Sequence, residues 1–416
     1  MDVGGGPRPT GRPRTRREVR APGRAVVVTV LRAPSAARVG WRLVIEPALR
    51  SLSWSLICER DGAGGPGAPA EHRVWAGRHE HPEKWRSLLE GLVPHDDAVW
   101  DGPLADPRAE LAVARELGAA LLPRALREGL SADGDAVHTL TVATRGWCAA
   151  VPWDALVVDA SDTRLLERCR ILTEAHPLAA VGRAPAAHRP PPAPGEPDGV
   201  VVLDPGPLTD EDPTLAPLYP AGLPPELRDL GQGADLHLSG RDGLGSAELG
   251  AVLRERPWAR FLYAGHVRPG WPKDPGNVAL VLSDGQAADL LPAYDWLDRP
   301  DTWPAPERVA LIGCGSGDGR ASEDVGLPLA ALRAGAQLVT ATRWVLPADL
   351  SEHEPNFTRL VRAVHAAHAS TDPVGALRDW QLTELHRWRS SGYALHAPLT
   401  WAATTTTVLP DVGEVG

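Results

Sequence analysis

The chain is almost without lysine, methionine and phenylalanine. Its 416 residues include one methionine and two phenylalanines, and lysine occurs only at Lys84 and Lys273. Arginine therefore carries nearly all of the positive charge, while glycine and proline each number 42. This composition is typical of a gene from a bacterium with a high genomic GC content, so we expect a bacterial protein.

What the chain lacks also excludes several classes of protein. No apolar run reaches 18 residues, so no transmembrane helix is predicted. The first 24 residues have no apolar stretch of the kind that a signal peptide needs. The four cysteines form no C-x-x-C pair and no regular spacing, which indicates neither a disulfide framework nor a zinc site. We therefore expect a cytoplasmic protein with reduced thiols and no membrane association.

Metal and nucleic-acid binding are not predicted either. His79 and His81 alternate in a polar stretch that we interpret as a loop, and they lack a clear set of further ligands nearby. The formal net charge of −10 argues against nucleic-acid binding, which needs a broad basic surface. Residues 1–24 nevertheless carry seven arginines, and they predict a disordered, solvated basic arm. No cofactor site is predicted.

The remaining chain is longer than one ordinary domain. Residues 25–105 contain three β-like runs, at 26–31, 41–45 and 51–57, and predict a small antiparallel β-rich region. Residues 106–416 predict the main domain, which begins with an amphipathic helix over 106–122 and a kink at Pro123. Strands over 140–143, 200–203, 260–264, 309–313 and 338–342 then alternate with helices over 246–256 and 327–334. Such alternation is typical of an α/β fold with a parallel or mixed sheet and helices on both faces.

Two of these strands end in chemically active residues. The run 260–264 is followed by Gly265 and His266, and the run 309–312 by Gly313 and Cys314. Active groups collect at the carboxyl ends of parallel strands, where loops hold them over a crevice. A thiol with an ordinary pKa of about 8.5 is mostly protonated at neutral pH, and an imidazole within reach takes its proton. We therefore interpret His266 and Cys314 as the base and nucleophile of an acyl transfer.

The same two residues also have an ordinary structural interpretation. A cysteine at the end of a buried strand is more often a small apolar side chain than a nucleophile. A lone histidine usually makes a structural hydrogen bond. The two residue types alone leave both interpretations open.

The motifs around these residues resemble the CHAT domain, a family of caspase-like clan CD cysteine peptidases related to separases. The segments that carry the resemblance follow the family's order and are Leu140–Leu156 with its Pro-Trp-Asp-Ala-Leu block, Phe261–His266, Leu311–Gly317, Glu323–Ala336, Val339–Asp349, Asp372–Arg378 and His396–Ala402. Together they cover roughly residues 106–409. No segment is diagnostic alone, but their number and order make a strong signal.

The resemblance implies a caspase-like three-layer fold, with a mostly parallel central sheet and helices on both faces, preceded by a small β-rich N-terminal region. It implies a cysteine endopeptidase with His266 and Cys314 as its dyad and without a cofactor. It further implies a specific protein substrate and regulation by an activating or adaptor protein. Two positions depart from the family pattern, because Val267 stands where glycine is usual and Gly313 where alanine is usual.

Glycines flank both members of the dyad. Gly265, Gly313 and Gly315 allow the backbone to approach a substrate closely. The amides of residues 315–317 are expected to form an oxyanion hole, a cluster of donors that stabilises the negative charge of the reaction.

Acidic residues downstream of Cys314 predict a pocket for a basic residue before the scissile bond. The candidates are Asp318, Glu323, Asp324 and Asp349, and Trp344 is a candidate for an aromatic wall. The alternatives are charges at a helix start for the acids and a core position for the tryptophan.

Two other functions stay open. The segment Leu311–Gly319 resembles the first glycine-rich loop of S-adenosylmethionine-dependent methyltransferases, although no acidic residue immediately precedes Gly313 or ends the strand over 338–342. The second alternative is a non-catalytic caspase-like scaffold that recognises partners, which Val267 and Gly313 suggest and the retention of His266 and Cys314 opposes.

Overall fold

The fold is that of a computed structural model. It describes residues 28–32, 40–48, 50–60, 70–92, 100–134, 136–180, 183, 196–203, 218–219, 223–238, 243–270, 277–283, 287–317, 326–347, 349 and 355–409. The basic arm over residues 1–24 lies outside this range. Every helix in the described part of the chain is too short or too polar to cross a membrane.

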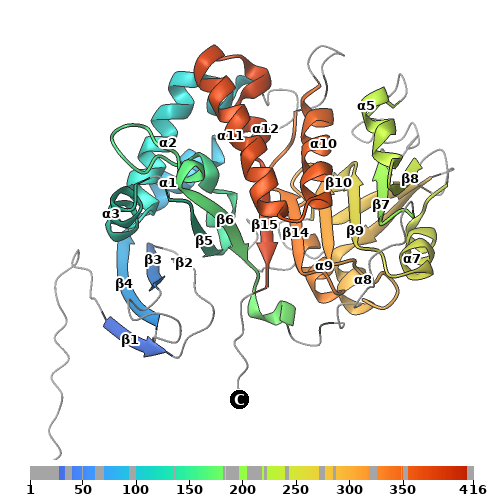
Figure 1. The fold of residues 1–416 in the computed structure, drawn as a ribbon, viewed down its shortest axis with the longest axis horizontal. Coiled ribbons are helices and arrows are strands. Elements are labelled where there is room, and N and C mark those ends of the chain that lie inside the picture. The colour runs from blue at the N-terminus through green and yellow to red at the C-terminus, as the bar shows by residue number, and fades with distance from the viewer. Residues whose placement is uncertain are drawn as a thin grey trace, which may run out of the picture.

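One large sheet runs through the molecule (Figure 1). Its strands are β1 (Val28–Arg32), β2 (Gly40–Ala48), β3 (Ser51–Arg60), β4 (Ala70–Glu80), β5 (His138–Thr144), β6 (Cys169–Glu174), β7 (Gly199–Leu203), β8 (Ala234–Leu238), β9 (Arg260–Ala264), β13 (Arg308–Ile312), β14 (Leu338–Thr342) and β15 (Thr404–Val408). Their order across the sheet is β1-β4-β3-β2-β5-β6-β15-β14-β13-β9-β7-β8. The predicted strands over 140–143, 200–203, 260–264, 309–313 and 338–342 are all confirmed, to within two residues at each end.

The sheet consists of two parallel blocks that point in opposite directions. Strands β14, β13, β9, β7 and β8 are mutually parallel, and so are β2, β5, β6 and β15. The blocks meet where β14 and β15 pair antiparallel, with Thr342 opposite Thr404. The carboxyl ends of β9 and β13 therefore lie at one edge of the sheet, and those of β5 and β6 at the other.

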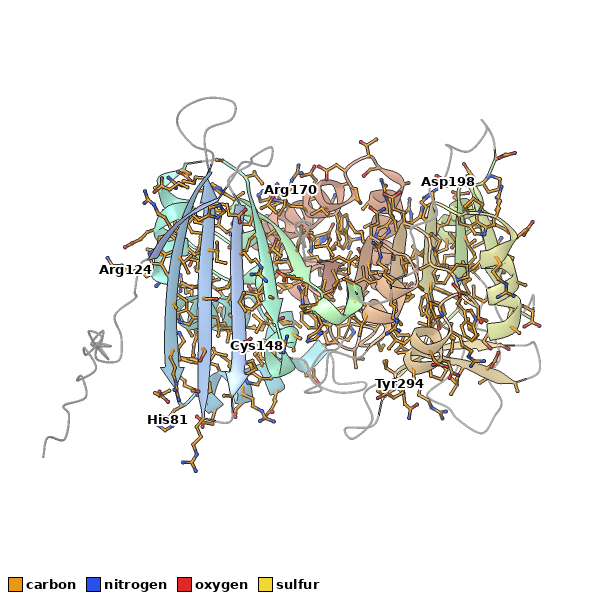
Figure 2. The ribbon with its side chains drawn as sticks, turned by 90° about the horizontal axis from the view of Figure 1, so that it is seen from below. His81, Arg124, Cys148, Arg170, Asp198 and Tyr294 are labelled. Carbon is orange, nitrogen blue, oxygen red and sulfur yellow. The ribbon has the colours of Figure 1, made fainter. Side chains whose placement is uncertain are left out.

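The N-terminal strands extend the second block. Strands β1, β4, β3 and β2 pair antiparallel, as predicted, and β2 joins β5 in parallel. The interpretation of His79 as a loop residue is wrong, because His79 lies within β4 and its ring packs edge-on against Trp85 at 5.3 Å. Figure 2 shows these strands face-on, with the helices behind them.

Helices cover both faces of the sheet, which confirms the predicted layers. They are α1 (Glu83–Glu90), α2 (Pro107–Leu121), α3 (Arg124–Ala132), α4 (Leu165–Arg168), α5 (Pro225–Arg228), α7 (Ser246–Glu255), α8 (Ala293–Asp298), α9 (Leu327–Arg333), α10 (Asn356–Ala369), α11 (Pro373–Ser391) and α12 (Pro398–Trp401). On β9, Leu262 packs in the core with α2, α10 and α11, whereas Phe261 packs in the core with α7, α8 and α9. This alternation follows from the two-residue period of a strand.

The predicted helix over 106–122 is α2, and its ends follow from local chemistry. The Asp106 carboxylate accepts hydrogen bonds from the backbone N–H groups of Arg108 (3.0 Å) and Ala109 (2.7 Å), which caps the first turn. The expected kink at Pro123 is instead a break, because α2 ends at Leu121 and α3 begins at Arg124. Proline has no N–H to continue the helical ladder.

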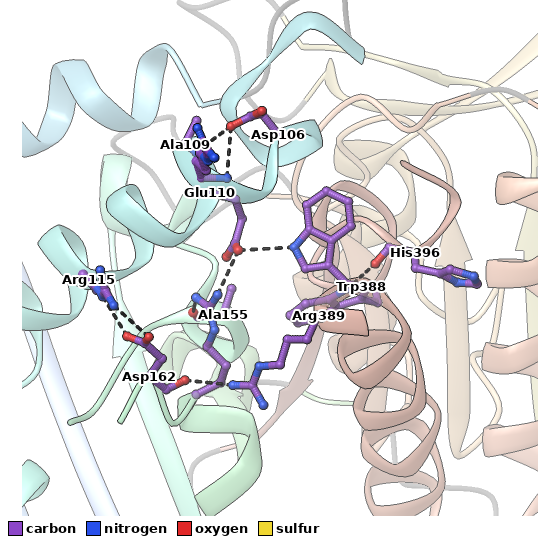
Figure 3. A network of polar contacts seen from close by, with 12 residues as sticks. Asp106, Ala109, Glu110, Arg115, Ala155, Asp162, Trp388, Arg389 and His396 are labelled. Atoms are coloured by element: carbon purple, nitrogen blue, oxygen red, sulfur yellow. Dashed lines mark hydrogen bonds and ion pairs between the residues drawn. The ribbon is translucent and has the colours of Figure 1, made fainter. Parts of the chain in front are cut away.

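A buried carboxylate joins α2 to α11. Glu110 is 2% exposed, and its Oε2 accepts from Arg164 (2.8 Å) and from the Trp388 indole (3.3 Å; Figure 3). Burial raises the pKa of Glu110, and the charge of Arg164 opposes this rise. The contact holds the N-terminal part of the main domain against its last long helix.

Candidate active site

His266 and Cys314 leave two neighbouring strands at matching positions. Strands β9 and β13 pair in parallel with Ala264 opposite Ile312, and each of the two residues comes two positions later. The N–H of Gly265 donates to the Ile312 carbonyl at 3.1 Å, so the pairing continues beyond the strand ends. Because neighbouring strands lie about 4.8 Å apart, this register brings the two backbones to the same place at the sheet edge.

The sheet is especially tight at Gly313. A Cβ at this position would lie 2.5 Å from the carbonyl oxygen of Gly265 and 2.7 Å from Cγ2 of Val267. Val267 is buried, with 6% of its surface exposed. The two residues that depart from the CHAT pattern therefore touch, and the side chain of Val267 takes up room that an alanine at position 313 would need.

This contact predicts that Gly313→Ala lowers the free energy of unfolding by about 1–3 kcal/mol, the usual cost of overpacking. Adding Val267→Gly should restore part of that loss, because it removes one of the two obstructing groups. Urea unfolding of both single variants and the double variant measures the coupling. Gly91→Ala is the control, since a Cβ there meets only ordinary contacts at 3.6 Å and beyond. Strictly additive single effects would contradict the steric pairing.

Cys314 is the one half-buried cysteine of four, because Cys58, Cys148 and Cys169 are buried. Burial raises the pKa of the Cys314 thiol, whereas hydrogen bonds from the N–H of Leu346 and from its own N–H oppose the rise. The thiol is therefore protonated at neutral pH unless a base takes the proton, and backbone donors are in place to stabilise the thiolate.

The backbone of His266 is held by the strand that follows it. The carbonyl oxygen of His266 accepts from the N–H of Val281 at 3.1 Å and lies 2.5 Å from the hydroxyl of Tyr263, which is fully buried. Residues Val267–Arg268 then form β10, which pairs with β11 (Ala279–Ser283), and β11 pairs with β12 (Ala288–Pro292). This small sheet fixes the chain on the far side of His266.

The loop after Cys314 is bound tightly to the end of β14. Gly315 has φ +66°, a conformation that favours glycine. The N–H groups of residues 315, 316 and 317 donate to the carbonyls of Trp344 (3.0 Å), Gly313 (3.0 Å) and Thr342 (2.8 Å). In this structure these three amides therefore bond carbonyls of the chain itself, and the oxyanion hole stays a prediction.

A family model describes most of this chain. The model of the CHAT domain matches residues 111–408. The chain belongs to the CHAT domain family. The resemblance in the motifs is thereby confirmed, together with the caspase-like α/β fold that it implies.

Solved structures of two peptidases are similar to this CHAT protein. A separase–securin complex from Saccharomyces cerevisiae has 14% identity and a TM-score of 0.39, and the match covers 66% of this chain but only 15% of the separase chain. The pro- and mature domains of RgpB from Porphyromonas gingivalis have 9% identity, a TM-score of 0.39 and 71% coverage of each chain. The Arg-specific cysteine proteinase gingipain R has 9% identity and a TM-score of 0.39, and the match covers 79% of this chain and 73% of the gingipain chain. A search of curated protein sequences finds no match.

Two of the predicted pocket residues, Trp344 and Asp349, make hydrogen bonds within the CHAT domain itself. Trp344 is 5% exposed and donates its indole N–H to the Leu399 carbonyl at 2.9 Å, so it is a core residue. The Asp349 carboxylate accepts from the N–H of Phe357 (2.7 Å) and from the hydroxyl of Thr358 (2.5 Å), and it thus binds the first turn of α10. Burial raises the pKa of Asp349 despite these bonds. Asp318, Glu323 and Asp324 lie outside the described residues.

We call residues 313–317, which follow β13 and include Cys314, the nucleophile loop of the CHAT domain. A cavity of about 250 Å³ lies beside this loop. Ser316 and Gly317 line it together with residues of β2, β5, β6, β15 and α9, and neither His266 nor Cys314 does so. The side chains of Ser316 and Thr342 contact each other at this loop, which was not predicted from the sequence. The sequence features that could have indicated this contact are a serine between two glycines and a threonine at the end of the next strand.

Proposed function

We propose that the chain is a cysteine endopeptidase, with Cys314 as the nucleophile and His266 as the group that takes and returns the proton. The observation that carries this proposal is the matching position of the two residues at the ends of β9 and β13. The backbone hydrogen bonds that lower the pKa of the Cys314 thiol support it, because they favour the thiolate.

The reaction follows from ordinary thiol chemistry. The Cys314 proton passes to His266, and the thiolate sulfur bonds to the carbonyl carbon of a peptide bond. His266 then gives the proton to the leaving nitrogen as the C–N bond breaks, which leaves a thioester. A water molecule loses a proton to His266 and adds to the thioester carbonyl. The C–S bond breaks, the acid is released, and the thiol regains its proton.

A specific protein substrate and regulation by an activating or adaptor protein are part of the same proposal. The CHAT assignment supports them, since the family includes regulated peptidases. The tightly bound turn over 315–317 adds a structural reason, because its amides become available to a substrate only after the turn rearranges.

The test is mass-spectrometric mapping of new peptide ends in a bacterial lysate incubated with the protein. Cuts are expected with the wild-type chain and with Cys148→Ala, which removes a buried thiol. They should disappear with Cys314→Ala. Identical maps for the wild type and Cys314→Ala would contradict the proposed activity and favour a non-catalytic scaffold.

A further inference from the structure

Two buried hydroxyl groups meet where the nucleophile loop packs against β14. Ser316 is 2% exposed, Thr342 is 0% exposed, and their side-chain oxygens are 3.0 Å apart. Ser316 is in the loop after β13, and Thr342 is the last residue of β14. The pair therefore joins the segment that presents Cys314 to the neighbouring strand.

Each hydroxyl uses its proton on a carbonyl that precedes Cys314. Ser316 Oγ donates to the Leu311 carbonyl at 2.5 Å, and Thr342 Oγ1 donates to the Gly313 carbonyl. Ser316 Oγ also accepts from the N–H of Thr342 at 2.9 Å. The first bond closes the turn around Cys314, and the two bonds of Thr342 attach that turn to β14.

The backbone bonds of the turn complete the same arrangement. The N–H groups of Gly315 and Gly317 donate to the carbonyls of Trp344 and Thr342, so both sides of the turn are attached to β14 and the residues after it. The chain then reaches Leu346, whose backbone lowers the pKa of the Cys314 thiol. The position of the thiol therefore depends on how the loop is held against β14 and the residues after it.

We propose that Ser316 and Thr342 are positioning residues, which hold the segment that presents the Cys314 thiol against the end of β14. This inference rests on the proposed peptidase function for its catalytic meaning. The placement of the thiol is, however, a property of the folded protein and can be measured without any substrate.

The measurement is the rate of Cys314 alkylation by iodoacetamide in the native full-length protein, followed by intact mass from pH 6 to pH 10. The other three cysteines are buried, so the early reaction reports on Cys314. Displacement of the loop should raise the pKa of the thiol, because the backbone at Leu346 lowers it when the thiol is in place. We expect Thr342→Val to raise the midpoint by about one unit and to slow alkylation at pH 7 by about tenfold. Ser316→Ala should act in the same direction, and Thr342→Ser should behave as the wild type.

Thr340→Val is the matched control. Thr340 lies two residues earlier in β14, is 1% exposed, and its hydroxyl contacts His368 at 2.8 Å, away from the nucleophile loop. It should lower the melting temperature as Thr342→Val does, without moving the alkylation profile. With a cleaved substrate from the lysate map, Thr342→Val should lower kcat by about 10²-fold and leave KM within about twofold, the pattern of a misplaced reacting group.

Two results would overturn the inference. The first is an alkylation profile unchanged in both Thr342→Val and Ser316→Ala, which would make the hydroxyls purely stabilising. The second is an equal shift in Thr340→Val, which would trace the effect to general loosening. A protein that cuts nothing yet shows the expected profiles would contradict the peptidase proposal alone, so the two failures are distinguishable.

Discussion

Replacing His266 with alanine is expected to lower kcat/KM for a cleaved protein by about 10²- to 10⁴-fold, the usual contribution of a positioned acid–base group. Burial raises the pKa of the Cys314 thiol, so without a base little thiolate exists at neutral pH. The residual cleavage by His266→Ala should therefore increase as the pH rises beyond about 8.5, the pKa of an ordinary thiol.

The pH–rate profile of each variant, measured on one substrate, provides the check. His386→Ala is the control, because His386 is exposed on α11 and its removal should change neither rate nor profile. A His266→Ala variant that retains wild-type kcat/KM would remove His266 from the reaction, whatever the result for Cys314. The same profile recorded with iodoacetamide separates thiolate formation from the later steps.

Replacing Arg343 with methionine is expected to lower the free energy of unfolding by about 3–5 kcal/mol. Arg343 is 2% exposed, lies 3.3 Å from the Asp154 carboxylate, and donates to the Ala402 carbonyl at 2.9 Å and to the Thr404 carbonyl. The substitution leaves Asp154 buried without its counter-ion. Burial already raises the pKa of Asp154, and only the charge of Arg343 and two hydrogen bonds oppose that rise.

Urea unfolding of Arg343→Met, Asp154→Leu and the double variant measures the pair. The double variant should be more stable than the sum of the single losses predicts, because it removes both buried charges together. Arg124→Met is the surface control: its partner Glu128 is four residues away and both side chains are largely exposed, so the loss should be about 0.3–0.5 kcal/mol. A loss in Arg343→Met as small as that of the control would show that the pair does not hold β14, β15 and the segment 153–155 together.

The sequence predicted the parallel core well because its strands are short apolar runs. Strands β9, β13 and β14 are buried along most of their length. Helix α7, which precedes β9, and helix α9, which lies between β13 and β14, have clear apolar stripes. Strand β4 was missed for the opposite reason. One of its faces carries Trp75 and the other Arg78, and charged or histidine side chains occupy most other positions, so no apolar run marks it.

The candidate site was predictable as far as the strand ends. That His266 and Cys314 follow adjacent strands agrees with the general placement of active groups in parallel sheets. The hydrogen bonds of the turn were not predictable, because the partners of the amides at 315 and 317 come from residues 342–344. Distance in sequence also hid the use of Trp344, whose partner Leu399 is 55 residues away. Asp349 bonds the nearby Phe357 and Thr358, but nothing in its own sequence pattern distinguishes such a helix contact from a pocket position.

Strand β15 joins the two parallel blocks, and it follows every other described strand in the chain. During synthesis, one edge of β14 and one edge of β6 therefore stay unpaired until residues 404–408 leave the ribosome. Exposed strand edges invite pairing with other chains, so the nascent protein passes through its most aggregation-prone state late. Thr404–Thr407 are four consecutive threonines. Their branched side chains favour a strand, and their hydroxyl groups make the unpaired segment less hydrophobic and so less prone to associate with other chains.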